Sequence, residues 1–118
     1  MLPLRLRDGR EVPVQVLICR DDVDPDLAIA AARQGALALL TLSNDAWFSD
    51  HPIGARLHQA AAAFRSIETR LPQFRVTTNG YSAAIDATGE VRAGALMNER
   101  SLVMGELPVP TPPRTLMV

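Results

Sequence analysis

Two apolar runs on either side of a short helical segment constrain the fold of this chain more than any other feature. The first, Glu11 to Ile18, is rich in valine, and the second, Ala36 to Leu42, follows a glycine stop at Gly35. Such continuous apolar runs are typical of strands that are buried on both faces of a sheet. Between them, Asp24-Pro25 provides an N-cap and a first-turn proline for an alanine-rich helix. This order predicts a βαβ crossover with parallel strands.

The second half of the chain predicts one longer helix followed by antiparallel strands. From Gly54 to Leu71, apolar residues recur every three or four positions, which indicates an amphipathic helix that ends before Pro72. Strand-like segments and turns then alternate. The expected strands are Phe74 to Thr78, Tyr81 to Asp86 and a run from Val91, and the expected turns are Asn79-Gly80 and Ala87 to Glu90. We therefore expect an α/β fold that ends in a β-meander.

The length and composition indicate one globular unit. A chain of 118 residues has room for a single domain. Hydrophobic residues make up 47% and charged residues 21%, which excludes a disordered chain, and the net charge of -1 gives no electrostatic footprint for nucleic acid. The segment from Leu107 to Val118 contains four prolines and is expected to form an extended or loose tail.

The chain offers little for metal or cofactor binding. Cys19 is the single cysteine, and His51 and His58 stand outside any zinc-binding spacing, so we expect no disulfide within the chain, no metal and no cofactor. No window of about 18 uninterrupted apolar residues is present, so no segment is expected to span a membrane.

Cys19 is the main candidate for chemistry. It follows the first predicted strand directly, and side chains at the carboxyl end of a parallel strand face the crevice where open α/β sheets bind ligands. The alternative is a buried thiol that behaves as a small hydrophobic side chain. Asp21, Asp22, Asp24 and Asp26 disfavour a thiolate and only Arg20 opposes them, so a nucleophilic Cys19 needs a base nearby.

Three further sets of polar or aromatic residues have two interpretations each. His58 lies on the predicted long helix and is either a boundary histidine or a base for Cys19. The loop from Asn44 to Phe48 follows the second strand and either joins Cys19 at the sheet edge or is a capped turn whose Trp47 fills the core. Arg65, Glu68 and Arg75 can form an ion-pair network across helix and strand, which has either a structural role, the one we expect, or a catalytic one.

Several segments together resemble a known family. LICRDD, LLTLSNDAWFSD and LHQAAAAFRSIETRLPQFRVTTNGYSAAIDATGEV are similar, in order and spacing from Val12 to Pro108, to the C-terminal part of the nitrilase-type (carbon–nitrogen hydrolase) domain of the apolipoprotein N-acyltransferase family. The resemblance implies part of an α-β-β-α sandwich. It also implies that Cys19 is the nucleophile of a Glu-Lys-Cys triad and that Asp21, Asn44 and Trp47 surround it or bind substrate.

The same resemblance implies a reaction and a location. Cys19 takes an acyl chain from a phospholipid as a thioester and passes it to the N-terminal amine of a lipoprotein, at the periplasmic face of the bacterial inner membrane, with membrane segments outside this chain. The family commonly has Cys-Tyr-Glu where this chain has Cys19-Arg20-Asp21, and the chain contains no lysine. We therefore expect residues 1–118 to form an incomplete domain that is inactive alone.

Two other functions remain open at this point. One is a soluble amidase of the nitrilase superfamily, because the nucleophile is shared. The other is a non-catalytic half-domain that needs a partner to supply the missing layer. Half of a two-layer sandwich exposes an apolar sheet face, so this second alternative predicts self-association.

Overall fold

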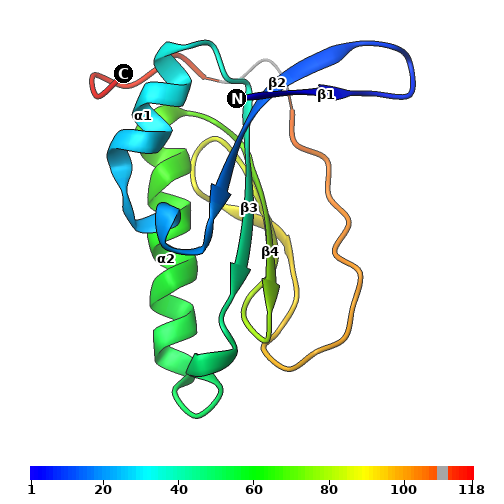
Figure 1. The fold of residues 1–118 in the computed structure, drawn as a ribbon, viewed down its shortest axis with the longest axis vertical. Coiled ribbons are helices and arrows are strands. Elements are labelled where there is room, and N and C mark those ends of the chain that lie inside the picture. Colours follow the sequence, from blue (N-terminus) through cyan, green and yellow to red (C-terminus); the bar gives the residue numbers. More distant parts are fainter. Residues whose placement is uncertain (109–111) are drawn as a thin grey trace.

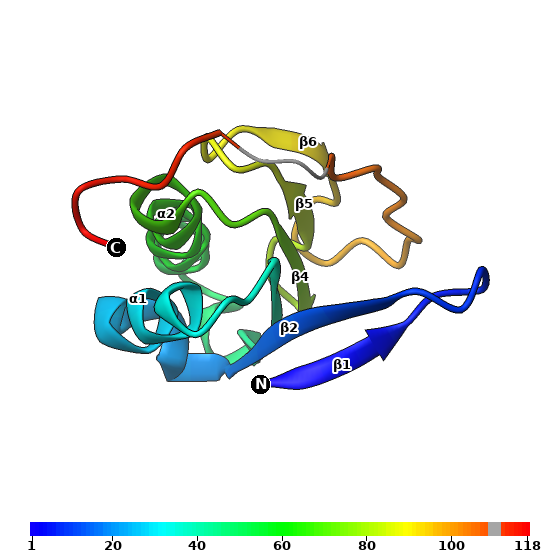
Figure 2. The same cartoon turned by 90° about the horizontal axis from the view of Figure 1, so that it is seen from above.

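The structure is a computed structural model that describes residues 1–108 and 112–118. Within these residues, one six-stranded sheet has the order β1-β2-β3-β4-β5-β6, and α1 and α2 lie on the same side of it (Figures 1 and 2). The elements in chain order are β1 (Leu2–Arg5), β2 (Glu11–Ile18), the 3₁₀ turn η1 (Cys19–Val23), α1 (Pro25–Arg33), β3 (Ala38–Asn44), the 3₁₀ turn η2 (Ala46–Phe48), α2 (Pro52–Thr69), β4 (Gln73–Thr78), β5 (Ala83–Ile85) and β6 (Val91–Gly94). The predicted α/β class is confirmed.

The centre of the sheet is parallel and its edges are antiparallel. β2, β3 and β4 form parallel pairs, with Leu17, Thr41 and Arg75 in register across the three strands. β5 and β6 continue as the predicted antiparallel meander. β1 pairs antiparallel with β2 through a turn at Gly9, whose φ is +85°, and this strand was not predicted. All four residues of β1 are exposed, so it leaves no burial pattern in the sequence.

The core lies between the parallel strands and the helices. Leu17 of β2 and Leu39 of β3 are fully buried against the alanines of α1 and against Leu71. Alanine side chains let the helix approach the sheet closely. The predicted N-cap of α1 is present, because the Asp24 carboxylate accepts a hydrogen bond of 3.0 Å from the backbone N–H of Asp26.

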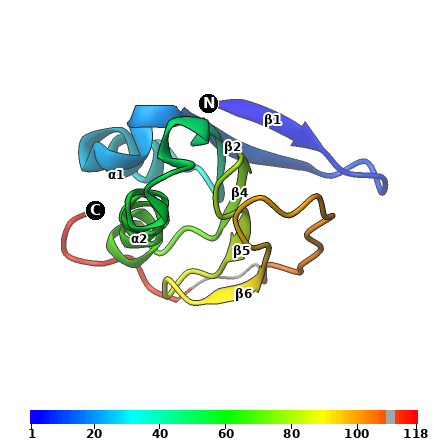
Figure 3. The same ribbon diagram turned by 90° about the horizontal axis from the view of Figure 1, so that it is seen from below.

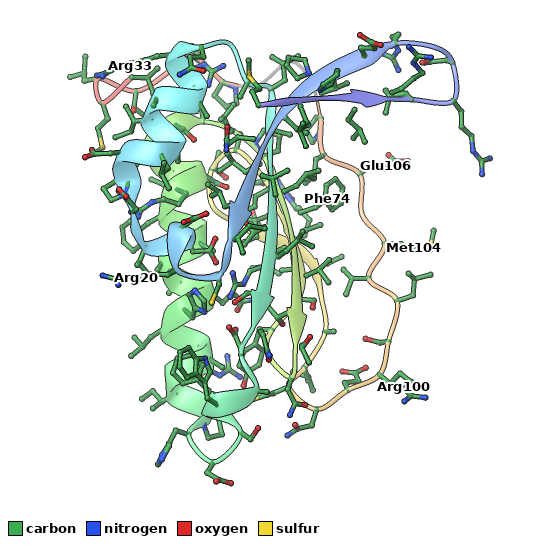
Figure 4. The ribbon with its side chains drawn as sticks, in the orientation of Figure 1. Arg20, Arg33, Phe74, Arg100, Met104 and Glu106 are labelled. Carbon is green, nitrogen blue, oxygen red and sulfur yellow. The ribbon has the colours of Figure 1, made fainter. Side chains whose placement is uncertain are left out.

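The opposite face of the sheet is largely open. Ile18, Leu42 and Val76 are in register on β2, β3 and β4, and their exposed fractions are 53%, 50% and 58%. In the described residues, the expectation that these strands are buried on both faces is therefore wrong. The segment after β6 runs along this side (Figure 2), and Phe74 lies on the same side as Met104 (Figure 4). Both helices are on the other side, so one layer of apolar side chains has no covering layer here.

The described part of the C-terminal tail contacts the body of the protein. Arg114 donates hydrogen bonds to the backbone carbonyls of Thr69, at 3.1 Å, and Ala36, at 3.0 Å. Arg33 of α1 donates to the carbonyl of Val118 at 3.0 Å. Where we expected a loose tail, these residues are held against the ends of both helices; residues 109–111 lie outside the described part.

The turn between β5 and β6 contains a buried carboxylate, Asp86, that should make stability depend on pH. Burial alone would raise the pKa of Asp86, but hydrogen bonds from Thr88, Glu90 and Arg92 lower it from 3.8 to about 2. Because the folded-state pKa is the lower one, this carboxylate stabilises the fold above about pH 4, and the contribution is lost as the pH falls towards about 2.

We therefore expect Asp86→Asn to lower the free energy of unfolding by about 1–2 kcal/mol at pH 7, and by much less near pH 2.5. Urea denaturation followed by circular dichroism at both pH values measures the difference between the wild type and the variant. A difference that does not change with pH would contradict the lowered pKa of Asp86.

Candidate functional site

Cys19 lies at a sharp turn on the carboxyl edge of the sheet. It follows β2 directly and has a φ of +50°, a left-handed backbone conformation that is uncommon for a non-glycine residue. The Asp21 carboxylate accepts a hydrogen bond of 2.9 Å from the backbone N–H of Ile18, which ties the turn to the end of the strand. The carboxyl ends of β2, β3 and β4 all point to this edge (Figure 1). The predicted place of Cys19 is confirmed, and its thiol is free and half-buried.

Two adjoining cavities at this edge share Cys19 and Trp47. The larger has a volume of about 490 Å³, and apolar side chains form most of its wall, among them Val23, Phe48 and Leu57. The smaller, of about 360 Å³, is lined by Cys19, Asn44 and Trp47. Trp47 is 75% exposed, so it lines a cavity and does not fill the core. The structure thus brings Cys19 together with the loop that follows β3, seen from this end in Figure 3.

The other two residues singled out near Cys19 have local roles in the turns. The Asn44 side chain accepts a hydrogen bond of 3.1 Å from the backbone N–H of Ala46, which closes a tight turn between β3 and η2. Asp21 holds the end of β2 and does not line either cavity. Arg20 lines the larger cavity, and its side chain points away from the body of the protein (Figure 4).

A cluster of charged side chains is buried directly behind these turns. Asp22, Asp45 and Arg75 are almost fully buried, and the His58 side chain is 11% exposed. One guanidinium nitrogen of Arg75 donates to Asp22 Oδ2, and the other donates to Asp45 Oδ2 at 3.1 Å. His58 Nδ1 lies 2.8 Å from Asp45 Oδ1, and its Nε2 lies 3.4 Å from Asp22 Oδ2. We call these four residues the buried charge cluster.

Opposing effects act on the carboxyl group of Asp22. Burial raises its pKa, because water no longer solvates the charged form, while the positive charges of Arg75 and His58 act to lower it. The net direction is upward. The attraction of its positive partners therefore offsets only part of the free energy that the Asp22 carboxylate loses when it is removed from water.

The buried charge cluster also decides between the two interpretations of His58. Both ring nitrogens of His58 face carboxylate oxygens, one of Asp45 and one of Asp22. His58 and Cys19 line the same cavity, but the side-chain hydrogen bond of His58 joins its Nδ1 to Asp45. His58 is a buried structural partner, and the geometry gives no support to a Cys19/His58 pair.

The predicted ion-pair network is partly wrong. Arg65 pairs with Glu68 at 2.8 Å, as expected, and also donates to the backbone carbonyl of Asp22 at 3.2 Å. Arg75, however, pairs with Asp22 and Asp45 and not with Glu68. Sequence reasoning missed these two aspartates as buried partners. The signal was available, since each one stands within a few residues of the carboxyl end of a parallel strand.

The part of the chain that the structure describes contains neither a metal-binding cluster nor a membrane-spanning helix. Among residues 1–108 and 112–118, no group of three or more His, Cys, Asp and Glu side chains is arranged to hold a metal ion. No helix of this part of the chain is both long and apolar enough to cross a bilayer.

Comparisons with known sequences identify the family of this chain. The carbon–nitrogen hydrolase family model matches residues 3–111. The chain is also similar to the apolipoprotein N-acyltransferases of Sinorhizobium fredii, at 39% identity over 84% of this chain and 18% of that protein, and of Brucella melitensis, at 34% identity over 93% and 20%. This chain therefore spans about a fifth of the length of these relatives.

Solved structures agree on the fold. A carbon–nitrogen hydrolase from Helicobacter pylori superimposes with a TM-score of 0.70 at 17% identity, over 80% of this chain and 39% of that chain. Saccharomyces cerevisiae Nit3, a member of branch 10 of the nitrilase superfamily, gives 0.61 at 22% identity, over 84% and 38%. The family model covers almost the whole chain and the fold is the same, so this chain belongs to the carbon–nitrogen hydrolase family.

Proposed function

We propose that this chain carries the nucleophile of an N-acyltransferase and that Cys19 is that nucleophile. The observation that carries the proposal is the geometry of Cys19, whose positive φ holds the thiol at the carboxyl edge of the sheet, beside an apolar cavity. Strained residues at such turns are frequent where a side chain must be presented to a substrate. The relatives named apolipoprotein N-acyltransferase support the choice of an acyl-transfer reaction.

The reaction has two steps. The Cys19 thiolate attacks the ester carbonyl of a phospholipid, a thioester bond forms, and the ester C–O bond breaks so that the alcohol leaves with a proton. The N-terminal amine of a lipoprotein then attacks the thioester, an amide forms, and the thiol is released. A covalent intermediate of this kind divides one difficult transfer into two easier steps. The apolar wall of Val23, Phe48 and Leu57 suits the acyl chain of the donor.

The remaining groups of the triad are proposed to come from outside this chain. The sequence contains no lysine, and both nitrogens of His58 are engaged by carboxylates. The open sheet face with Ile18, Leu42 and Val76 is where the other layer of an α-β-β-α sandwich would pack and bring those groups. In a complete enzyme the site would act at the periplasmic face of the inner membrane. The isolated chain would not transfer acyl groups from phospholipid.

An activated acyl donor tests the nucleophile without the missing groups. We expect a palmitoyl thioester to acylate the chain at Cys19, giving one adduct by intact mass that neutral hydroxylamine removes. The apolar cavity should make palmitoyl react faster than acetyl by about tenfold. Cys19→Ser should give no hydroxylamine-sensitive adduct.

Acylation at other residues, or an equal rate for both donors, would remove the support for an acyl-transfer site. Rapid hydrolysis of short amides by the chain would favour an amidase instead.

A further inference from the structure

We infer that the buried charge cluster positions the thiol of Cys19 against Trp47, so that Asp22, Asp45, His58 and Arg75 are positioning residues for the nucleophile. This inference rests on the proposed function, because it concerns the same thiol. The cluster joins four elements that come from distant parts of the sequence. Asp22 belongs to η1, Asp45 precedes η2, His58 lies on α2, and Arg75 lies on β4.

The Cys19 turn is connected to the cluster through Asp22. This residue stands in the same 3₁₀ turn as Cys19, and its side chain accepts from Arg75. Its backbone carbonyl accepts a second hydrogen bond, of 3.2 Å, from Arg65 of α2. η1 is thereby fixed to both β4 and α2. A left-handed Cys19 needs such fixation, because a strained backbone conformation persists only where its surroundings over-determine it.

The Trp47 turn is connected to the same cluster through Asp45. The two carboxylate oxygens of Asp45 accept from Arg75 at 3.1 Å and from the Ser43 hydroxyl at 2.8 Å, and one of them lies 2.8 Å from His58. Asp45 stands directly before η2, which carries Trp47. Arg75 therefore holds the turns of Cys19 and Trp47 with the two nitrogens of one planar group.

A guanidinium suits this task for a geometric reason. Its donors form a rigid planar fork, so two carboxylates bound to the same group have a fixed separation. Apolar packing alone would let the two turns slide relative to one another. His58 adds a second bridge between the same two carboxylates. The cluster thus sets the width of the cavity between Cys19 and Trp47.

The test compares two maleimides that label Cys19, which is the single cysteine of the chain. N-ethylmaleimide reports the exposure of the thiol, and a long-chain N-alkylmaleimide also reports the fit of the apolar cavity. The quantity is the ratio of the two labelling rates under native conditions. As long as the folded chain is the species that is labelled, general destabilisation leaves this ratio close to its wild-type value, whereas a displaced thiol changes the ratio.

We expect Asp45→Asn to lower the ratio of long-chain to short-chain labelling by about tenfold, since a displacement of about 1 Å can cost up to ~10²-fold in a positioned reaction. Asp86→Asn is the matched control, because it removes another buried carboxylate that is bound to an arginine but lies outside the site. The control ratio should stay within about twofold of the wild type. If Asp45→Asn does not fold, His58→Gln serves as the second variant with the same expectation.

A double variant shows whether the effect passes through Trp47. Trp47→Ala should lower the ratio by itself, and adding Asp45→Asn should lower it no further, because the wall that Asp45 positions is already gone. The inference would be overturned if the double variant lowered the labelling ratio by the product of the two single effects. It would also be overturned if Asp86→Asn lowered the ratio as much as Asp45→Asn. Maleimide labelling does not require acyl transfer, so a chain that forms no thioester but shows the expected ratios contradicts the proposed function alone.

Discussion

Replacing Arg75 with leucine is expected to lower the free energy of unfolding by about 3–5 kcal/mol, the loss typical of a broken buried ion pair. The side chain is fully buried and donates to both Asp22 and Asp45. Without it, two buried carboxylates lose their arginine partner, and His58 remains beside them. Because a domain of this size has a total stability of about 5–15 kcal/mol, the variant should unfold at much lower urea concentration, which circular dichroism at 222 nm measures.

Two further variants test whether the loss comes from the buried ion pairs of Arg75: a substitution of an exposed arginine, and a variant in which the unpaired carboxylates are also removed. Arg92 also pairs with an aspartate, Asp86, but its side chain is 55% exposed, so Arg92→Leu should cost only about 1 kcal/mol. Adding Asp22→Asn and Asp45→Asn to Arg75→Leu should restore part of the stability, because the unpaired charges are then removed. Equal losses for the two arginine variants would show that the buried charge cluster is not held by Arg75.

The elements with a clear apolar or capping pattern were predicted from the sequence, whereas an exposed strand and the covering of the two sheet faces were not. Glu11–Ile18 was predicted with the bounds of β2, because a valine-rich run and the cap at Asp24 are both local signals. β1 was missed because it is an exposed edge strand. The burial of the parallel strands was also predicted wrongly. Runs of this kind are usually covered on both faces, and in the described residues the helices cover only one.

For the candidate site, too, one part could be predicted from the sequence and another could not. The place of Cys19 at the carboxyl edge follows from its position after a strand and before a helix, and the structure confirms it. The ion pair between Asp22 and Arg75 could not be predicted from the sequence, because the two residues are 53 positions apart. Arg75 reaches Asp22 because the register of β3 and β4 turns its side chain towards the helices. The sequence pattern makes Asp22 a nearby negative charge that disfavours a thiolate, but in the structure its buried carboxylate is paired with Arg75.

Gly80→Ala is the second variant with a large expected effect, a loss of about 2–3 kcal/mol in the free energy of unfolding, at the upper end for an added methyl group in a packed site. An ideal Cβ at Gly80 would lie 2.5 Å from Asp45 Oδ2 and 2.8 Å from the hydroxyl oxygen of Thr77. Asp45 cannot move away at low cost, because the same oxygen accepts from Arg75 and the other one faces His58. The glycine is therefore required by the close approach of the charge cluster.

Gly94→Ala separates this steric effect from the general effect of replacing a glycine in the region from β4 to β6. The nearest atoms to a Cβ at Gly94 lie at 3.4 Å, at the edge of ordinary contact, so the variant should stay within about 0.5 kcal/mol of the wild type. Urea denaturation of both variants tests the difference. Because the clash pushes on Asp45, Gly80→Ala should also slow labelling of Cys19 by the long-chain maleimide relative to N-ethylmaleimide, whereas Gly94→Ala should not. A stable Gly80→Ala would mean that Asp45 moves freely, which is incompatible with a carboxylate fixed by Arg75 and His58.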